Sequence, residues 1–206
     1  MKKITAISVV SLLLLASCGG KGKDAASMDY GLEEANEVIS YYNTSIDITK
    51  KMVDMGEISK IIDYMQKNGK TLVAPVVIRT PVSATDTTAL LNPGDCFPSS
   101  AADSLKMYYR RFFDVSKRLY ANYDAYRAYI KAEDYKDDNY AKGNEICKEE
   151  KELAEQIPGL RSQIYALLTP YADKAEEATL MDNPLKDHIP VSYTHLRAHE
   201  TVLDLV

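Results

Sequence analysis

The sequence predicts an all-α protein: long antiparallel helices in an up-down bundle, with a connection rich in Pro, Thr and Ser after the first helix. Two observations lead to this prediction. Apolar and aromatic side chains recur at steps of three and four over most of residues 31–178, which is the period of one helix face. Turn-forming residues gather in one long stretch, residues 70–99.

The first predicted helix covers residues 31–67. Gly56 weakens its middle by about 1 kcal/mol relative to Ala, and Asn68-Gly69 is a favourable helix end. Its spacing predicts one buried stripe, formed by Ala35, Ile39, Tyr42, Ile46, Thr49, Val53, Ile58, Ile61, Ile62 and Met65.

The connection that follows has two parts. Residues 71–81 are β-branched and contain Pro75 and Pro81, which predicts an extended segment or an edge strand. Residues 83–100 are rich in Thr, Ser, Pro and Gly and predict a loop. Connections of this length are usually functional or disordered.

The second long helix is predicted to open at Ser100, where Ser100-Ala-Ala-Asp103 resembles a capping box, and to end before a turn at residues 132–138. Tyr120, Tyr123, Tyr126 and Tyr129 follow one another at steps of three, so their rings either form a binding groove for glycan or peptide or lie in the core with their hydroxyls at its edge. The predicted stripe comprises Leu105, Tyr108, Phe112, Val115, Leu119, Tyr123, Tyr126 and Ile130.

Two further helices complete the bundle. Asp138 is placed to accept backbone N–H groups at the start of a helix over residues 139–156. Pro158 either kinks that helix or starts the next one, and Pro170 is expected to kink the last helix, residues 160–178. Acidic and basic residues between Lys142 and Glu155, Glu150 among them, predict a solvated helix face.

The N-terminus is typical of a bacterial lipoprotein. Residues 1–17 combine Lys2 and Lys3 with a short Leu-rich run, as a signal peptide does. The run ends in Leu15-Ala16-Ser17-Cys18, which resembles the lipobox, so we expect cleavage before Cys18 and acylation of its thiol. Residues 18–30 then predict a flexible tether. The implied location is the cell envelope, lipid-anchored, with the outer membrane favoured because Gly19 follows the cysteine.

The last residues, 190–206, are predicted to be an artefact. Residues 191–200 read Val-Ser-Tyr-Thr-His-Leu-Arg-Ala-His-Glu, which is similar to a translated transposase-type sequencing adapter, and the codons that follow fit the same frame. We therefore expect a truncated helical domain over residues 31–189. On this interpretation the i, i+4 pair of His195 and His199 is not a zinc site, although its spacing would suit one.

One motif resembles a known family. Residues 129–143, with the turn Tyr135-Lys-Asp-Asp-Asn139 followed by Ala141-Lys-Gly143, resemble the YiiG-like lipoproteins, a family of unknown function. Ser40-Tyr-Tyr-Asn43 is similar to a second, weaker signature. The resemblance spans residues 33–187. It implies an all-α envelope lipoprotein and carries over no catalytic residue.

No arrangement of catalytic residues is recognised in the sequence. Glu133, Asp134, Asp137 and Asp138 form a carboxylate cluster that lacks the spacing of a calcium loop, and is favoured as a helix cap and solvated turn. Whether Cys96 and Cys147 pair is left open.

We therefore expect no catalytic, cofactor or metal residue, and one lipidation site, Cys18. The predicted function is a non-enzymatic helical binding or scaffold module, held to the membrane by its lipid, with an envelope protein or glycan as partner. The alternative is a hydrolase of envelope polymers that uses carboxylate acid–base chemistry. The net charge of −5 at pH 7 argues against a nucleic-acid partner.

Overall fold

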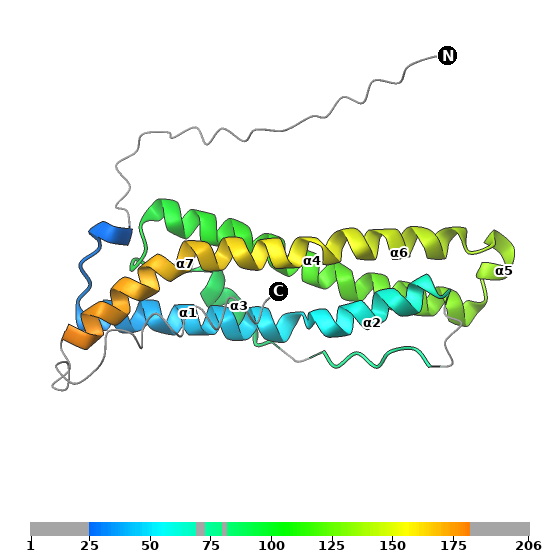
Figure 1. The fold of residues 1–206 in the computed structure, drawn as a ribbon, viewed down its shortest axis with the longest axis horizontal. Helices are drawn as coiled ribbons and strands as arrows, with labels where there is room; N and C mark the ends of the chain where they lie inside the picture. The colour runs from blue at the N-terminus through cyan, green and yellow to red at the C-terminus, as the bar shows by residue number, and fades with distance from the viewer. Residues whose placement is uncertain (1–24, 69–72, 80–81, 182–206) are drawn as a thin grey trace, which may run out of the picture.

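The computed structural model describes residues 25–68, 73–79 and 82–181, which form helices and no strands (Figure 1). The predicted all-α fold is confirmed. Residues 1–17, Cys18 and the tail 190–206 lie outside the described residues. The helices are η1 (Ala25–Ser27), α1 (Leu32–Met52), α2 (Met55–Gln66), α3 (Ala84–Leu91), α4 (Ser99–Ala132), α5 (Tyr135–Asp138), α6 (Ala141–Ala154) and α7 (Gln156–Met181).

The bundle consists of three rods, α1–α2, α4 and α6–α7, with α3 wedged beside α1 and α4 (Figure 1). The rod α6–α7 runs antiparallel to α4, since Arg118 bonds Glu149 while the earlier Arg111 bonds the later Gln156. In contrast, α4 runs parallel to α1–α2, because the long connection returns the chain to the end at which α1 begins (Figure 1).

The first rod is broken, which differs from the single helix predicted over residues 31–67. Val53 and Asp54 are extended, and the Asp54 carboxylate accepts the Glu57 backbone N–H at 3.1 Å as the N-cap of α2. The break therefore lies at a capping residue, not at Gly56. The rod ends at Gln66, as predicted, and Asn68 takes a left-handed conformation. The buried face differs in part from the predicted stripe, because Ile39, Tyr42, Ile46 and Ile62 are only partly buried. The residues of this rod that are fully or nearly fully buried include Ala35, Val38, Ser45, Ile48, Thr49, Val53, Ile58, Ile61, Tyr64 and Met65.

The connection contains a helix that the sequence prediction missed. Ser83 caps α3 by accepting the Asp86 backbone N–H at 3.1 Å, and Leu90 at its end is fully buried. Residues 73–79 form neither helix nor strand. Side chains hold this segment to α4: the Tyr123 hydroxyl donates to the Pro75 carbonyl at 2.5 Å, and Arg79 bonds Asp124 at 2.6 Å. Pro75 lacks a backbone N–H, which limits sheet pairing here.

Tyrosine side chains of α4 fill the space between α4 and the first rod. Tyr123 and Tyr126 are buried, and the Tyr126 hydroxyl donates to the Met65 carbonyl at 3.0 Å. Tyr109, in place of the predicted Tyr108, is fully buried and donates to the Ser45 hydroxyl. The core interpretation of the tyrosine stripe is therefore confirmed for Tyr123, Tyr126 and Tyr129, while Tyr120 is partly buried. These phenols satisfy buried acceptors while their rings supply apolar contact.

The structure corrects one predicted helix cap and modifies another, near the two ends of α4. The helix begins at Ser99 after Pro98, with no side-chain cap, so the capping box expected at Ser100 does not form. At the other end Asp138 accepts the Lys142 backbone N–H at 3.0 Å and the Tyr129 hydroxyl at 2.6 Å. It thus supports the start of α6 as expected, although the cap position itself is Tyr140.

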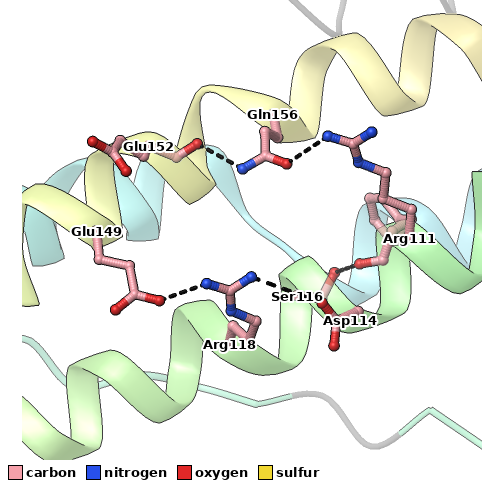
Figure 2. Close-up of polar contacts among 8 residues, drawn as sticks. Arg111, Asp114, Ser116, Arg118, Glu149, Glu152 and Gln156 are labelled. Carbon is pink, nitrogen blue, oxygen red and sulfur yellow. Dashed lines mark hydrogen bonds and ion pairs between the residues drawn. The ribbon is translucent and has the colours of Figure 1, made fainter.

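The third rod passes from α6 into α7 with only Glu155 between them, and Pro158 lies in the first turn of α7. Pro170 lies inside α7, and Figure 1 shows the end of this helix turning toward α1. Polar contacts join this rod to α4 on the surface (Figure 2): Arg118 bonds Glu149 at 2.6 Å, and Arg111 bonds Gln156 at 3.1 Å.

Two glycines of this rod should respond oppositely to alanine. A Cβ at Gly143 would lie 2.7 Å from a ring carbon of Tyr129, whereas a Cβ at Gly159 would meet nothing within 4 Å. We expect Gly143→Ala to lower the free energy of unfolding by about 1–3 kcal/mol through overpacking. Gly159→Ala should raise it by about 0.5–1 kcal/mol through helix propensity. Urea denaturation of both variants tests this; destabilisation by Gly159→Ala, or none by Gly143→Ala, would contradict the packing.

The end of the predicted tether belongs to the bundle. Tyr30 is buried, and its hydroxyl donates to the Cys96 carbonyl at 3.2 Å. Ala25 and Met28 pack against the same core. The packed domain therefore begins before residue 31, because an aromatic ring at residue 30 covers the end of the core near α3.

Candidate functional site: a cleft at the break between α1 and α2

The break in the first rod forms one wall of a cleft of about 1130 Å³, and α7 forms the other. Lys50, Val53 and Met55 come from the rod, and Arg161, Tyr165 and Ala166 come from α7. Most of the wall is apolar. The volume lies slightly above the range of small-molecule sites, which are typically about 300–1,000 Å³.

Arg161 holds the two walls together. Its Nη2 donates to the Thr49 carbonyl at 2.7 Å and to the Val53 carbonyl, which the end of α1 leaves without helical partners. The guanidinium also lies over the Phe112 ring, 5.9 Å from its centroid. Tyr165, one helical turn later, shares a hydrogen bond with the Thr49 hydroxyl. The broken helix and α7 are thus positioned by the same two side chains.

The Arg161 side chain carries a buried positive charge that forms no direct ion pair, although the charge of Asp54 at the same wall acts on it. The residue is only 5% exposed, and its Nε has no hydrogen-bond partner. Within the part of the chain that the structure describes, no carboxylate forms an ion pair with it. Burial lowers the pKa of the guanidinium, but an arginine remains charged at neutral pH.

The described wall of the cleft carries few polar groups. The other charged groups at its wall are Lys50 and Asp54, both exposed, and Asp54 is engaged as the cap of α2. Ser162 and Thr169 add hydroxyl groups. A hydroxyl nucleophile requires an adjacent base, and among the described residues of the wall no His is present. Apolar walls with one buried cation can hold a ligand by burial and by charge.

The predicted carboxylate cluster lies at the far tip of the bundle, away from this cleft. Glu133 pairs with Lys136, and Asp138 bonds Tyr129 and the backbone of Lys142. The Tyr129 hydroxyl bond, followed by bonds from the backbone, lowers the pKa of the Asp138 carboxyl. Among residues 25–68, 73–79 and 82–181, no group of three or more His, Cys, Asp or Glu is placed to hold a metal.

Cys96 and Cys147 are both buried and unpaired, so the disulfide left open by the sequence does not form in this structure. Burial raises the pKa of both thiols, that of Cys96 to about 11. No helix within the described residues is both long and apolar enough to span a bilayer. Cys18 lies outside these residues.

A second buried ionisable group lies on α6. Glu150 is fully buried, and neither of its carboxylate oxygens has a hydrogen-bond partner. Burial, and secondarily the charge of Glu149, raises the pKa of Glu150 to about 8. The expectation that Glu150 belongs to a solvated face is therefore wrong, whereas Lys148 and Glu152 on that face do form a surface pair at 3.8 Å.

Neither Arg161 nor Glu150 is predicted as a buried charge from the sequence. A signal for both was present in the helical spacing. Residues Cys147, Glu150, Ala154, Ile157, Arg161 and Ile164 follow one another at steps of three and four, and all six are buried. A charged residue on such a stripe indicates a buried charge, and buried charges are unusual enough to mark candidate sites.

Solved structures from Bacteroides share this fold. A DUF3829 family protein from Bacteroides vulgatus is 35% identical with a TM-score of 0.67, and the match covers 71% of this chain and 96% of that one. An alpha helical protein from Bacteroides fragilis is 33% identical with a TM-score of 0.63, and the match covers 76% of this chain and 59% of that one. An uncharacterized DUF3829-like protein from Bacteroides thetaiotaomicron is 28% identical with a TM-score of 0.59, and 76% of this chain and 56% of that one are covered.

None of these descriptions names a ligand or an activity, and no curated protein matches the chain. The matched family differs from the one suggested by the turn at residues 135–143. The family model covers residues 29–182, which include α1 to α7 and therefore both walls of the cleft. The chain belongs to the family described as a domain of unknown function, DUF6845.

Proposed function

We propose that this protein is an envelope lipoprotein, anchored through acylated Cys18, whose helical domain is a non-enzymatic binding module with its ligand site in the cleft between the α1–α2 break and α7. The observation that carries the binding role is the buried, unpaired Arg161 in a cleft of about 1130 Å³. The anchor is supported by Leu15-Ala16-Ser17-Cys18. The outer membrane is the proposed location.

An anchor at Cys18 would limit the distance between the start of the bundle and the membrane. Ala25, which begins η1, is seven positions after Cys18. A chain of that length spans at most about 25 Å, at 3.3–3.6 Å per residue. The end of the bundle that carries η1 and the start of α1 would therefore lie close to the membrane, with α5 at the distal tip.

The hydrolase alternative receives no specific support. A glycosidase places two carboxylates on opposite sides of a scissile bond, about 5–9.5 Å apart in a cleft. Here Glu133 is engaged by Lys136 and Asp138 by Tyr129, both in a turn at the tip of the bundle. A groove of exposed tyrosines for glycan is likewise not retained, because Tyr123 and Tyr126 are buried.

We also propose that the resemblance of residues 129–143 to the YiiG-like lipoproteins reflects a distant relationship. The motif has a structural role that a shared fold would preserve. Tyr129 and Asp138 bond each other, and Gly143 allows α6 to approach the Tyr129 ring. Left-handed backbone at Asn139 and Tyr140 turns the chain between these residues.

The anchor is tested by Cys18→Ser. We expect the wild-type protein to fractionate with membranes and to carry an acylated N-terminal Cys18 by mass spectrometry. Two or more acyl chains, each CH₂ contributing about 0.8 kcal/mol when buried, suffice for stable anchoring. The variant should leave the membrane or retain its signal peptide. Cys147→Ser, at a thiol on α6 outside the lipobox, is the control for cysteine loss. Unchanged processing and membrane association of Cys18→Ser would contradict the anchor.

A further inference from the structure

We propose that the cleft binds an anionic single-chain amphiphile, with its head group at Arg161 and Lys50 and its apolar chain along α7. This inference rests on the proposed binding role of the cleft and names the class of ligand. The chemistry shared by the candidate ligands is one negative head group, either carboxylate or phosphate, joined to an aliphatic chain.

The sign of the head group follows from the charges at the wall. Arg161 contributes a buried positive charge. The Nη2 atom of its guanidinium donates to two backbone carbonyls, and its Nε has no hydrogen-bond partner. Lys50, at the end of α1, has no ion-pair partner among the described residues. A buried charge without an ion-pair partner is unfavourable. An anion that binds here should therefore gain more binding free energy than it would beside an exposed arginine. The carboxylate of Asp54 bonds the Glu57 N–H of its own helix.

The apolar part of the ligand follows from the rest of the wall. Val53 and Met55 lie on one side, and Tyr165, Ala166 and Pro170 on the other. Gly159 leaves open space where another residue would project a side chain. Because each buried CH₂ contributes about 0.8 kcal/mol, an alkyl chain would supply most of the affinity, while the head group would decide which amphiphile is selected.

The test measures binding of four probes with the same alkyl chain to the full chain by isothermal titration calorimetry, below micelle-forming concentrations. The chain carries Cys18→Ser so that no acyl group of its own competes. The probes are decanoate, decyl phosphate, decyl maltoside and decyltrimethylammonium. We expect saturable one-to-one binding of decanoate or decyl phosphate, at least tenfold tighter than binding of the neutral and cationic probes. The stronger of the two anions identifies the head group.

A matched pair of variants locates the site. Ala166 is exposed and lines the cleft, so the ring of Ala166→Phe should obstruct the path of the alkyl chain and weaken anion binding at least tenfold. Gln163 is exposed on the same helix outside the cleft, so Gln163→Phe should leave binding unchanged. Lys50→Gln should weaken it about two- to fivefold, since a rim charge contributes less than about 1 kcal/mol. Arg161 itself is not replaced, because it also holds the α1 carbonyls. Circular dichroism confirms that each variant is folded.

The outcomes separate the two proposals. Equal binding of all four probes, abolished by Ala166→Phe, would overturn the anionic head group while leaving the cleft as a binding site. Binding of the anions that Ala166→Phe and Gln163→Phe weaken equally would overturn the placement in this cleft. Absence of saturable binding of every probe would overturn both the ligand class and the proposed binding role for amphiphiles.

Discussion

Replacing Phe112 with alanine should lower the free energy of unfolding by about 3–5 kcal/mol, the range for buried aromatic residues truncated to alanine. Phe112 is fully buried at the centre of α4. Its ring contacts the Phe113 ring at 6.2 Å between centroids and lies beneath the Arg161 guanidinium at 5.9 Å. Truncation would leave a cavity and remove the aromatic face from a buried cation. Because domains are stable by only about 5–15 kcal/mol, the variant should be close to unfolding.

Phe113 supplies the matched control for this experiment. It is the adjacent residue of the same helix, has the same side chain and is only partly buried. Phe113→Ala should therefore lower the free energy of unfolding by less than half as much. Urea denaturation followed by far-UV circular dichroism measures both changes. A cost below about 1 kcal/mol for Phe112→Ala, or equal costs for the two variants, would mean that this face of α4 is not the packed core described here.

The apolar period was sufficient to predict the rods and much of the core. Leu105, Phe112 and Leu119 were assigned to one face of α4 from their spacing, and all three are fully buried. Tyr108 was assigned to that face but is partly buried, while its neighbour Tyr109 is fully buried. A phenol can be buried where its hydroxyl finds an acceptor, here Ser45, and spacing carries no information about such an acceptor.

The break in the first rod was missed although the apolar spacing changes there. Val53 lies in the break and Ile58 follows five positions later, a step longer than the helical three or four, and both are buried. The local signal was Asp54 followed three residues later by Glu57, a pattern typical of a helix start. Similarly, Ser83 followed by Asp86 marks the start of α3 within residues that composition assigned to a loop.

The candidate site could not be assembled from the sequence for a related reason. It depends on the carbonyls that the break in the first rod leaves free, and on Arg161, more than a hundred positions later in the chain. Only the tertiary structure brings these groups together. What the sequence could have shown is a charged residue on an apolar stripe, for Arg161 and for Glu150 alike.

The protein should lose stability as the pH rises from about 4.5 to 8, and Glu150 should be the cause. Its pKa is near 4.5 in the unfolded chain and about 8 in the folded one, mainly because of burial. The folded state therefore holds a proton that the unfolded state has released, and the free energy of unfolding falls by about 1.4 kcal/mol per pH unit in that window. The stability from this proton is fully present below pH 4.5 and is lost as the pH passes through 8.

Glu150→Gln isolates this effect, because the amide has nearly the shape of the protonated carboxyl and no charge. Other groups titrate in both proteins, so the quantity to measure is the difference in free energy of unfolding between variant and wild type, from urea denaturation at several pH values. We expect a difference near zero at pH 4.5 that grows to about 3 kcal/mol at pH 7, in favour of the variant. Glu152→Gln is the control: Glu152 is exposed on the same helix and pairs with Lys148, so its removal should give no comparable rise over this window. A constant difference between Glu150→Gln and wild type over this window would mean that the Glu150 carboxyl reaches water or a partner, and that the face of α6 between Cys147 and Ala154 is not sealed.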